Sequence, residues 1–322
     1  LGVSTAMRRL GQTSTYQSRQ VTSSDSTVVT ASANSAATVG PHRVEVLALA
    51  QAHSFYGTNF ESNTEALGLE GQMLIDGQLV SVDATDNLNT IASRINSQVS
   101  SVRALALQTG QNEYRLTITR RQTGNQEIQI YQAGTSNLLL DLGLVTGSTT
   151  AANPITNGVA SRSYSNQTST IASLMNLRSP APAGTLTLDD GNVAINVSLD
   201  LQNQNLQGIA LAINNESTLQ GSSVNAAVVS EVVNGSTQYR LEITGASGVT
   251  LTDDNHILET LGVLKPVLAN ESVAAQDARV VVNGITVNRS NNIVSDVIPG
   301  VTLFLAKADP GRPVTLNITQ DN

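Results

Sequence analysis

The side chains that could do chemistry are few and scattered. The three histidines, His42, His53 and His256, lie in different segments, without the H-E-x-x-H spacing that brings two imidazoles to one metal ion. Asp189-Asp190 and Asp253-Asp254 could offer carboxylates to calcium. Neither pair has the alternating oxygen ligands and closing Glu of an EF-hand loop, so we interpret both as turns. The sequence therefore predicts no metal site and no cofactor site.

Covalent catalysis has no support in the sequence either. No G-x-S-x-G elbow, P-loop or G-x-G-x-x-G follows an expected strand. The chain contains no Cys, which excludes a thiolate nucleophile, a disulfide framework and a Cys-based zinc site. With 3% aromatic and 13% charged residues, few groups could shift a neighbour's pKa or shape a pocket. We predict that the protein is not an enzyme and assign no catalytic residue.

The composition excludes further classes of protein and of partner. A chain of 322 residues with 40% hydrophobic content can bury the cores of two or three domains. A formal net charge of −8 argues against nucleic-acid partners, because phosphate neutralisation needs clustered Lys and Arg. No apolar run approaches the roughly 18 to 20 residues of a membrane-spanning helix, so we expect no membrane insertion. The abundance of Ser, Thr, Asn and Gln suits an extracellular or assembly-forming protein.

An internal repeat is the most informative feature of the sequence. A hairpin, a short helix and a second pair of strands recur in the same order, and Tyr-Arg-Leu-x-Ile-Thr occurs in both copies, at 114–119 and 239–244. The helix of each copy has apolar residues at spacings of three and four, which indicates one buried stripe. These stripes are Leu88, Ile91, Ala92 and Ile95 in the first copy, and Leu206, Ile209, Ala210 and Ile213 in the second.

Turn residues complete the pattern. Asp76-Gly77 and Asp190-Gly191 predict tight hairpin turns, because Gly accepts the positive φ of a primed turn. Asn96 and Asn214 fit helix C-terminal positions, where Asn tolerates the left-handed conformation. The fold class is therefore α+β and β-rich, with two related modules that each pack a short amphipathic helix on a small antiparallel sheet, preceded by a short helical and extended N-terminal stub.

The closing strands suggest how the modules are connected. Strands expected at 278–282, 285–287, 301–305 and 314–319 need partners, and the early strand Val44–Leu49 and the first repeat are the natural candidates. We therefore predict that the second repeat is an insertion. The expected domains are 1–38, an N-terminal stub and extended connector; 39–157 plus 271–322, a discontinuous first domain; and 158–270, the inserted second domain. Fully separate tandem modules are the alternative.

The two ends of the chain resemble a known family. Residues 275–305 contain a D-A strand, an N-G turn, an R-S-N step and a D-x-I-x-G-V-T-L strand, which is similar to the signature of the bacterial flagellar filament cap proteins, or hook-associated protein 2. Residues 24–50 resemble the N-terminal region of that family. With the two repeats between them, the resemblance covers nearly the whole chain.

This resemblance implies a function and partners. Members of the family form a homo-oligomeric ring at the distal tip of the extracellular flagellum and promote the folding and insertion of exported flagellin. Their head domains form a plate, and their helical coiled-coil legs reach the filament end. Some members also attach to a host surface or mucin. Export uses the flagellar secretion apparatus without a cleaved signal peptide, and residues 1–10 show no such signal.

By the same resemblance, residues 1–38 contain the remnant of a leg. Met7, Leu10 and Tyr16 are the residues there that we expect to contact the filament or a neighbouring subunit. Other interpretations stay open: another flagellar axial protein, such as a hook–filament junction protein or a flagellin with outer domains; a surface adhesin built of β-rich modules; or a secreted hydrolase.

Overall fold

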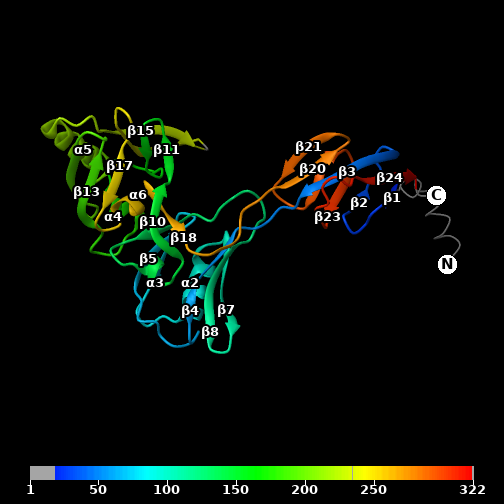
Figure 1. Ribbon diagram of the computed structural model, residues 1–322, viewed down its shortest axis with the longest axis horizontal. Coiled ribbons are helices and arrows are strands. Elements are labelled where there is room, and N and C mark those ends of the chain that lie inside the picture. Colours follow the sequence, from blue (N-terminus) through cyan, green and yellow to red (C-terminus); the bar gives the residue numbers. More distant parts are fainter. Residues whose placement is uncertain (1–18, 234, 321–322) are drawn as a thin grey trace, which may run out of the picture. The chain divides into compact units, whose positions relative to one another are not determined.

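The computed structural model describes residues 19–233 and 235–320 (Figure 1). The fold is β-rich with few short helices, as predicted. The chain separates into two compact units. The first, here called the terminal unit, comprises Leu1–Ser54, Thr119–Glu127 and Ser272–Asn322. The second, here called the repeat unit, comprises Phe55–Ile118 and Ile128–Glu271. No helix among the described residues is long and apolar enough to cross a membrane.

The terminal unit joins strands from the two ends of the chain. Its five-stranded antiparallel sheet has the order β1 (Arg19–Ser23), β24 (Val314–Gln320), β3 (Gly40–Ala48), β20 (Ala278–Val282) and β21 (Ile285–Arg289). A second sheet has the order β2 (Val29–Ala33), β23 (Val301–Leu305) and β22 (Ile293–Ile298). Alternating apolar residues of both sheets form one core. The predicted pairing of the early strand with closing strands is confirmed, because β3 lies between β24 and β20.

The Asn283-Gly284 turn between β20 and β21 also follows the prediction. Both residues have positive φ, 50° and 88°, as a two-residue type I′ hairpin requires. The Asn283 side chain adds a link across the sheet, because its Oδ1 accepts the backbone N–H of Arg43 at 3.0 Å.

The first repeat occupies the first part of the repeat unit, and β4 and β8 run from it into the terminal unit. This repeat contains two antiparallel sheets, with orders β6-β5-β9 and β19-β4-β8-β7, and the helix α2, and their apolar residues form a core of their own. The elements are β4 (Ser54–Phe60), β5 (Gly71–Ile75), β6 (Gln78–Val82), α2 (Leu88–Gln98), β7 (Val102–Gly110), β8 (Glu113–Arg120), β9 (Ile130–Ala133), α3 (Leu138–Asp141), β10 (Val145–Ala151) and β19 (Glu271–Val273).

The second repeat follows the same plan, so the predicted duplication is confirmed at the level of topology. Its sheets have the orders β14-β13-β17 and β11-β12-β16-β15, and its core is again separate. The elements are β11 (Asn153–Ile155), β12 (Gly158–Ala160), α4 (Ile171–Met175), β13 (Ala183–Asp189), β14 (Ala194–Asp200), α5 (Leu206–Gln220), β15 (Asn225–Val233), β16 (Ser236–Thr244), β17 (Thr250–Asp253), α6 (Ile257–Leu261) and β18 (Leu264–Leu268).

Equivalent glycines end the equivalent short helices. Gly143 follows α3 and Gly262 follows α6, both with left-handed φ of 65° and 71°. A side chain at either position would collide with a nearby segment of the same polypeptide, at Thr58 in the first repeat and at Arg162 in the second. The Leu-Gly-Leu and Leu-Gly-Val matches in the sequence therefore mark the same close approach in both repeats.

The two repeats meet through equivalent strands. β10 and β18 pair with each other antiparallel, with Thr150 opposite Lys265 and Ala151 opposite Leu264. Antiparallel pairing of equivalent strands is the arrangement expected around an approximate local two-fold axis. A small apolar cluster centred on Tyr131 adds contacts from both repeats.

The two long helices begin as the sequence indicates. Asn87 accepts the N–H of Thr90 at 2.9 Å before α2, and Asn205 accepts the N–H of Gly208 at 2.7 Å before α5. The eight residues of the predicted apolar stripes are all buried.

Asn96 and Asn214 do not end these helices, so this prediction is wrong. Both lie inside a helix, and each side chain bonds the backbone of one residue in the next strand. Asn96 bonds both the N–H and the C=O of Ala104, at 2.9 and 2.7 Å, and Asn214 does the same with Ala226, at 2.8 Å each. Since β7 and β15 are edge strands, the two amides occupy the place of a missing neighbouring strand.

The two predicted hairpin turns of the repeats differ. Asp76-Gly77 is a two-residue turn with φ of 48° and 79°, as expected. The Asp190-Gly191 prediction is wrong in detail, because residues 190–193 form a four-residue loop between Asp189 and Ala194. Asp190 points inward there and accepts the N–H groups of Asn192, Val193 and Ser223. These hydrogen bonds hold the pKa of its carboxyl well below the usual range. The domain bounds given above stay a prediction.

Candidate functional site: the repeat junction and the exposed surfaces

The predicted contact residues Met7, Leu10 and Tyr16 lie outside the described residues. The histidines are not brought together: His42 and His53 belong to the terminal unit, and His256 belongs to the repeat unit. Among the described residues, no group of three His, Asp or Glu side chains could hold a metal ion.

The two predicted aspartate turns are stabilised differently. Asp189 accepts the N–H of Gly191 within its own loop at 2.8 Å, whereas Asp254 accepts the N–H of the distant Thr185 at 2.9 Å. Arg120, at the end of β8, donates from Nη2 to Gln126 Oε1 at 3.1 Å.

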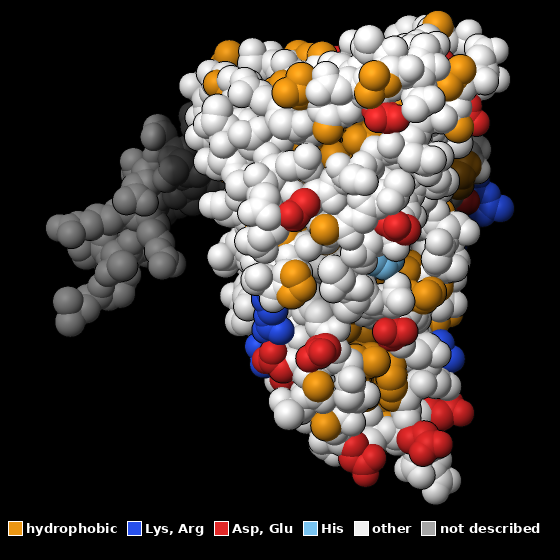
Figure 2. All heavy atoms as spheres, turned by 90° about the vertical axis from the view of Figure 1, so that its left-hand side faces the viewer, with side chains coloured by type: hydrophobic (Ala, Val, Ile, Leu, Met, Phe, Trp, Pro, Cys, Tyr) orange, Lys and Arg blue, Asp and Glu red, His pale blue; other side chains and the backbone are white. Residues whose placement is uncertain are grey.

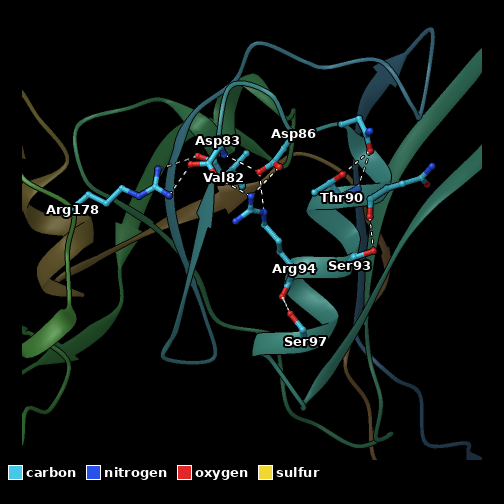
Figure 3. Close-up of polar contacts among 10 residues, drawn as sticks. Val82, Asp83, Asp86, Thr90, Ser93, Arg94, Ser97 and Arg178 are labelled. Carbon is cyan, nitrogen blue, oxygen red and sulfur yellow. Dashed lines mark hydrogen bonds and ion pairs between the residues drawn. The ribbon is translucent and has the colours of Figure 1, made fainter.

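A charged network follows the first hairpin (Figure 3). The loop from Asp83 to Asp86 faces two guanidinium groups, Arg94 of α2 and Arg178 of the connector after α4. Arg94 Nη2 donates to Asp83 Oδ2 at 2.8 Å and to Asp86 Oδ1 at 3.0 Å. Arg178 Nη2 donates to the other oxygen of Asp83 at 2.8 Å. Asp83 therefore links the first repeat to the segment that begins the second.

This arrangement lowers the pKa of Asp83. The hydrogen bond from Arg178 is the largest cause, and the positive charges of Arg178 and Arg94 add to it. Within the part of the chain that the structure describes, the equivalent loop of the second repeat forms no ion pair and is held by hydrogen bonds. There Gln202 N–H donates to Asp200 at 2.9 Å, and Gln204 Oε1 accepts the N–H of Asp200 at 2.7 Å. The charged network is thus a property of the first repeat and is not required by the shared fold.

A second polar contact joins the two repeats at His256. This residue precedes α6, and its Nε2 lies 2.9 Å from Oδ1 of Asn137, which precedes the equivalent helix α3. Its Nδ1 lies 3.3 Å from Oε1 of Glu259. Since both ring nitrogens face oxygen atoms, the doubly protonated imidazolium fits this site. The contact with Glu259 accordingly raises the pKa of His256, whereas burial raises the pKa of nearby Asp253.

A cavity of about 140 Å³ lies beside this contact. It is lined by both repeats, including Asn137, Leu140, His256 and Pro266. Pockets for small-molecule ligands usually measure about 300 to 1,000 Å³, so this one is small for a substrate. The site can hold a proton between His256 and Glu259 and can connect the repeats.

An open polar cleft of about 770 Å³ lies in the terminal unit, between residues 121–126 and the loop at Ser290. Its polar groups are largely paired with one another. Thr123 Oγ1 donates to the carbonyl of Ser290 at 2.7 Å, and the N–H of Asn125 donates to Asp277 at 2.8 Å. These bonds fasten residues 121–126 to the rest of the terminal unit.

Exposed apolar side chains gather on several surfaces (Figure 2). In the first repeat they lie on one face of β7, and in the second repeat on α5 and at the end of the β15–β16 hairpin. They are Leu105 and Leu107; Leu211 and Leu219; and Val232 and Val233. The terminal unit adds Ile293 and Phe304, which are opposite each other on β22 and β23. Such surfaces are candidates for contacts with other proteins.

Sequence reasoning missed the polar junctions for a physical reason. Asn137 and His256 are 119 residues apart, and no local pattern marks their contact. The ion pairs of Asp83 had a partial local signal, since Asp83 and Asp86 precede a helix that carries Arg94 on its second turn. The exposed leucines of α5 were visible as apolar residues off the buried stripe.

Two family models match the chain, one at each end. The model for the flagellar hook-associated protein 2 N-terminus matches residues 1–53, and the model for its C-terminus matches residues 275–322. The described strands of these segments pair with one another in the terminal unit. Both ends of the chain therefore match one class of bacterial flagellar protein, the hook-associated proteins. Within that class, both matches are to the flagellar hook-associated protein 2 family, the filament cap proteins.

The chain is also similar, at low sequence identity, to solved structures of flagellar cap proteins. The D1-D2-D3 domains of FliD from Escherichia coli are 18% identical, with a TM-score of 0.33, and the match covers 98% of this chain and 59% of that chain. The D2-D3 domains from Serratia marcescens are 15% identical, with a TM-score of 0.43 and coverage of 91% and 100%. This chain thus spans 59% of the length of the Escherichia coli structure. No protein with a curated description matches the sequence.

Proposed function

We propose that this chain is a subunit of a flagellar filament cap that self-assembles into a ring at the distal tip and promotes the folding and insertion of exported flagellin. The observation that carries the proposal is the pair of family regions at 1–53 and 275–322. Because β24 pairs with β1 and β3, the two matched regions fold together in one unit. Two matches that fold together support the proposal more strongly than two separate local matches would.

The mechanism in this proposal is binding without covalent chemistry. A cap must hold its neighbours and still allow them to shift as each flagellin is added, which requires interfaces with several states of similar free energy. Exposed apolar side chains surrounded by neutral polar groups support such interfaces, since wet contacts re-form without leaving a buried charge unpaired. Met7, Leu10 and Tyr16 would contact the filament end, and 158–270 would be an inserted head domain.

The proposed location is the extracellular tip of the flagellum, reached through the flagellar secretion apparatus without cleavage of a signal peptide. Deletion of the full-length gene should leave cells that secrete unpolymerised flagellin, and the wild-type gene should restore filaments. Filament length by electron microscopy and flagellin in the culture supernatant are the two measurements. Normal filaments in the deletion strain, together with a loss of surface attachment, would instead favour an adhesin.

The contact residues can be tested in the same strain. A complementing gene with Leu10→Glu should be exported but restore fewer or shorter filaments, because the change puts a charge on a proposed apolar contact. Thr5→Glu in the same stretch is the matched control and should restore normal filaments. Equal filament lengths for the two variants would contradict the assignment of Leu10 and leave the cap function itself standing.

A further inference from the structure

The outer face of α5 differs from that of its equivalent, α2. The exposed residues Ser93 and Ser97 of α2 are polar, and its partly buried Arg94 binds Asp83 and Asp86. In α5 the position of Ser93 is taken by Leu211, whose exposed fraction is 61%, and Leu219 further along is 78% exposed. A helix with apolar residues on both faces is usually covered on both faces. The common fold therefore does not explain the exposed leucines of α5.

The exposed residues of α5 are arranged symmetrically. Ile209, Ile213 and Ser217 face the core, so exposed Asn215 lies near the centre of the opposite face. Leu211 precedes Asn215 by four residues, and Leu219 follows it by four. With a rise of 1.5 Å per residue, the two leucines lie about 12 Å apart along the helix axis. They form one ridge with i, i+4 spacing, the type of ridge that packs between the ridges of a second helix.

Charge does not oppose contact between two copies of this face. Glu216 is the single charged residue of α5, and Gln220 Nε2 donates to its carboxylate at 3.0 Å at the side of the face. In Figure 2, which views the side where Figure 1 places α5, the upper part of the surface carries apolar and uncharged side chains with few charged ones. A partner helix of the same composition meets no like charge at the centre.

From these observations we infer that α5 binds α5 of a second copy of the chain in an antiparallel, two-fold symmetric contact. Asn215 meets its own counterpart at the axis, and Leu211 of one copy packs against Leu219 of the other. An isologous contact of this kind joins copies in pairs, whereas a ring requires heterologous contacts. The inference is therefore independent of the ring proposed above.

The size of the contact sets its strength. Two leucines and an amide from each copy bury much less than the roughly 1,000 Å² that a stable interface needs. The pair is therefore weak in dilute solution and forms where copies are concentrated or held side by side by other contacts.

Cysteine cross-linking tests the inference directly, because the chain has no Cys of its own. Asn215→Cys places a thiol at the proposed axis, and Ser97→Cys places one at the equivalent exposed position of α2 as the control. At equal, high protein concentration under mild oxidation, we expect Asn215→Cys to form disulfide-linked dimers about tenfold faster than Ser97→Cys. Equal rates for the two variants would overturn the contact.

The orientation has its own test. In a mixture of Leu211→Cys and Leu219→Cys proteins that differ in mass, the antiparallel contact predicts an excess of mixed dimers over the two homodimers. A statistical ratio of the three species would refute the antiparallel geometry. In addition, Leu211→Glu in the Asn215→Cys background should reduce cross-linking to the rate of Ser97→Cys, and an unchanged rate would contradict the role of Leu211. Far-UV circular dichroism checks that each variant is folded.

Discussion

The two helix asparagines give the sharpest prediction about stability. Replacing Asn214 by Ala removes both hydrogen bonds to Ala226, and β15 has no further strand on that side to replace them. A lost hydrogen bond costs about 1 kcal/mol, and a buried group left without a partner costs about 1 to 3 kcal/mol. Ala226 is 4% exposed, so we expect the free energy of unfolding to fall by about 2 to 4 kcal/mol.

The same change in the first repeat serves as an internal replicate. Asn96→Ala removes the equivalent pair of bonds to Ala104, which is 3% exposed, and should cost a similar amount. The exposed neighbour Asn215→Ala is the control and should change stability by less than about 0.5 kcal/mol. Urea unfolding followed by far-UV circular dichroism measures all three variants.

Because the repeats have separate cores, unfolding need not be two-state, and amide exchange gives a local measurement as well. Exchange of the Ala226 N–H should accelerate in Asn214→Ala and stay unchanged in Asn96→Ala. The prediction is wrong if Asn214→Ala lowers the free energy of unfolding no more than Asn215→Ala does and exchange at Ala226 is unchanged. The two hydrogen bonds of Asn214 would then contribute nothing to stability.

Three further predictions concern the junction, the connector and the core. The contact with Glu259 raises the pKa of His256 in the folded protein. Its stabilising effect is therefore fully present below the unfolded pKa of about 6.5 and disappears as the pH rises through the folded pKa. Glu259→Gln should remove this dependence and flatten a plot of the free energy of unfolding against pH in that range. Arg178→Ala should move the pKa of Asp83 upward in carboxyl NMR titrations and speed proteolysis near residue 178; an unchanged titration would show that Arg94 alone controls Asp83. Ile213→Ala in the core should cost about 2 to 5 kcal/mol in urea unfolding, and a loss below 1 kcal/mol would indicate a loosely packed helix.

The sequence was sufficient for those elements whose determinants are local. The stripe of α2 and the Asp76-Gly77 turn were predicted because spacing and backbone conformation alone define them. Asn96 was misassigned because an Asn near the end of a helix pattern has two uses: it can accept a left-handed conformation or bond a neighbouring strand. The second use depends on where β7 lies, which local sequence does not specify.

The candidate site was less accessible from sequence for a related reason. The contact of His256 with Asn137 exists because β10 and β18 pair and bring equivalent helix starts together. The antiparallel pairing between the repeats depends on tertiary packing, which local sequence does not specify. Tandem modules with the same sequence pattern could have packed in another way. The pairing of the early strand β3 with the closing strand β24 was expected from the sequence, but the contact between the repeats was not.

The duplication also supplies a physical control for interpreting surfaces. Two repeats of one topology impose the same demands at equivalent positions, so a difference at an exposed position is not explained by the needs of the fold. Arg94 in the first repeat corresponds to Ala212 in the second, and Ser93 corresponds to Leu211. The first repeat thus uses this helix surface to bind its own loop, through Arg94. In the second repeat Ala212 packs against the core instead, and Leu211 beside it is exposed; an exposed apolar residue that the shared fold does not require is consistent with the proposed contact to a second copy.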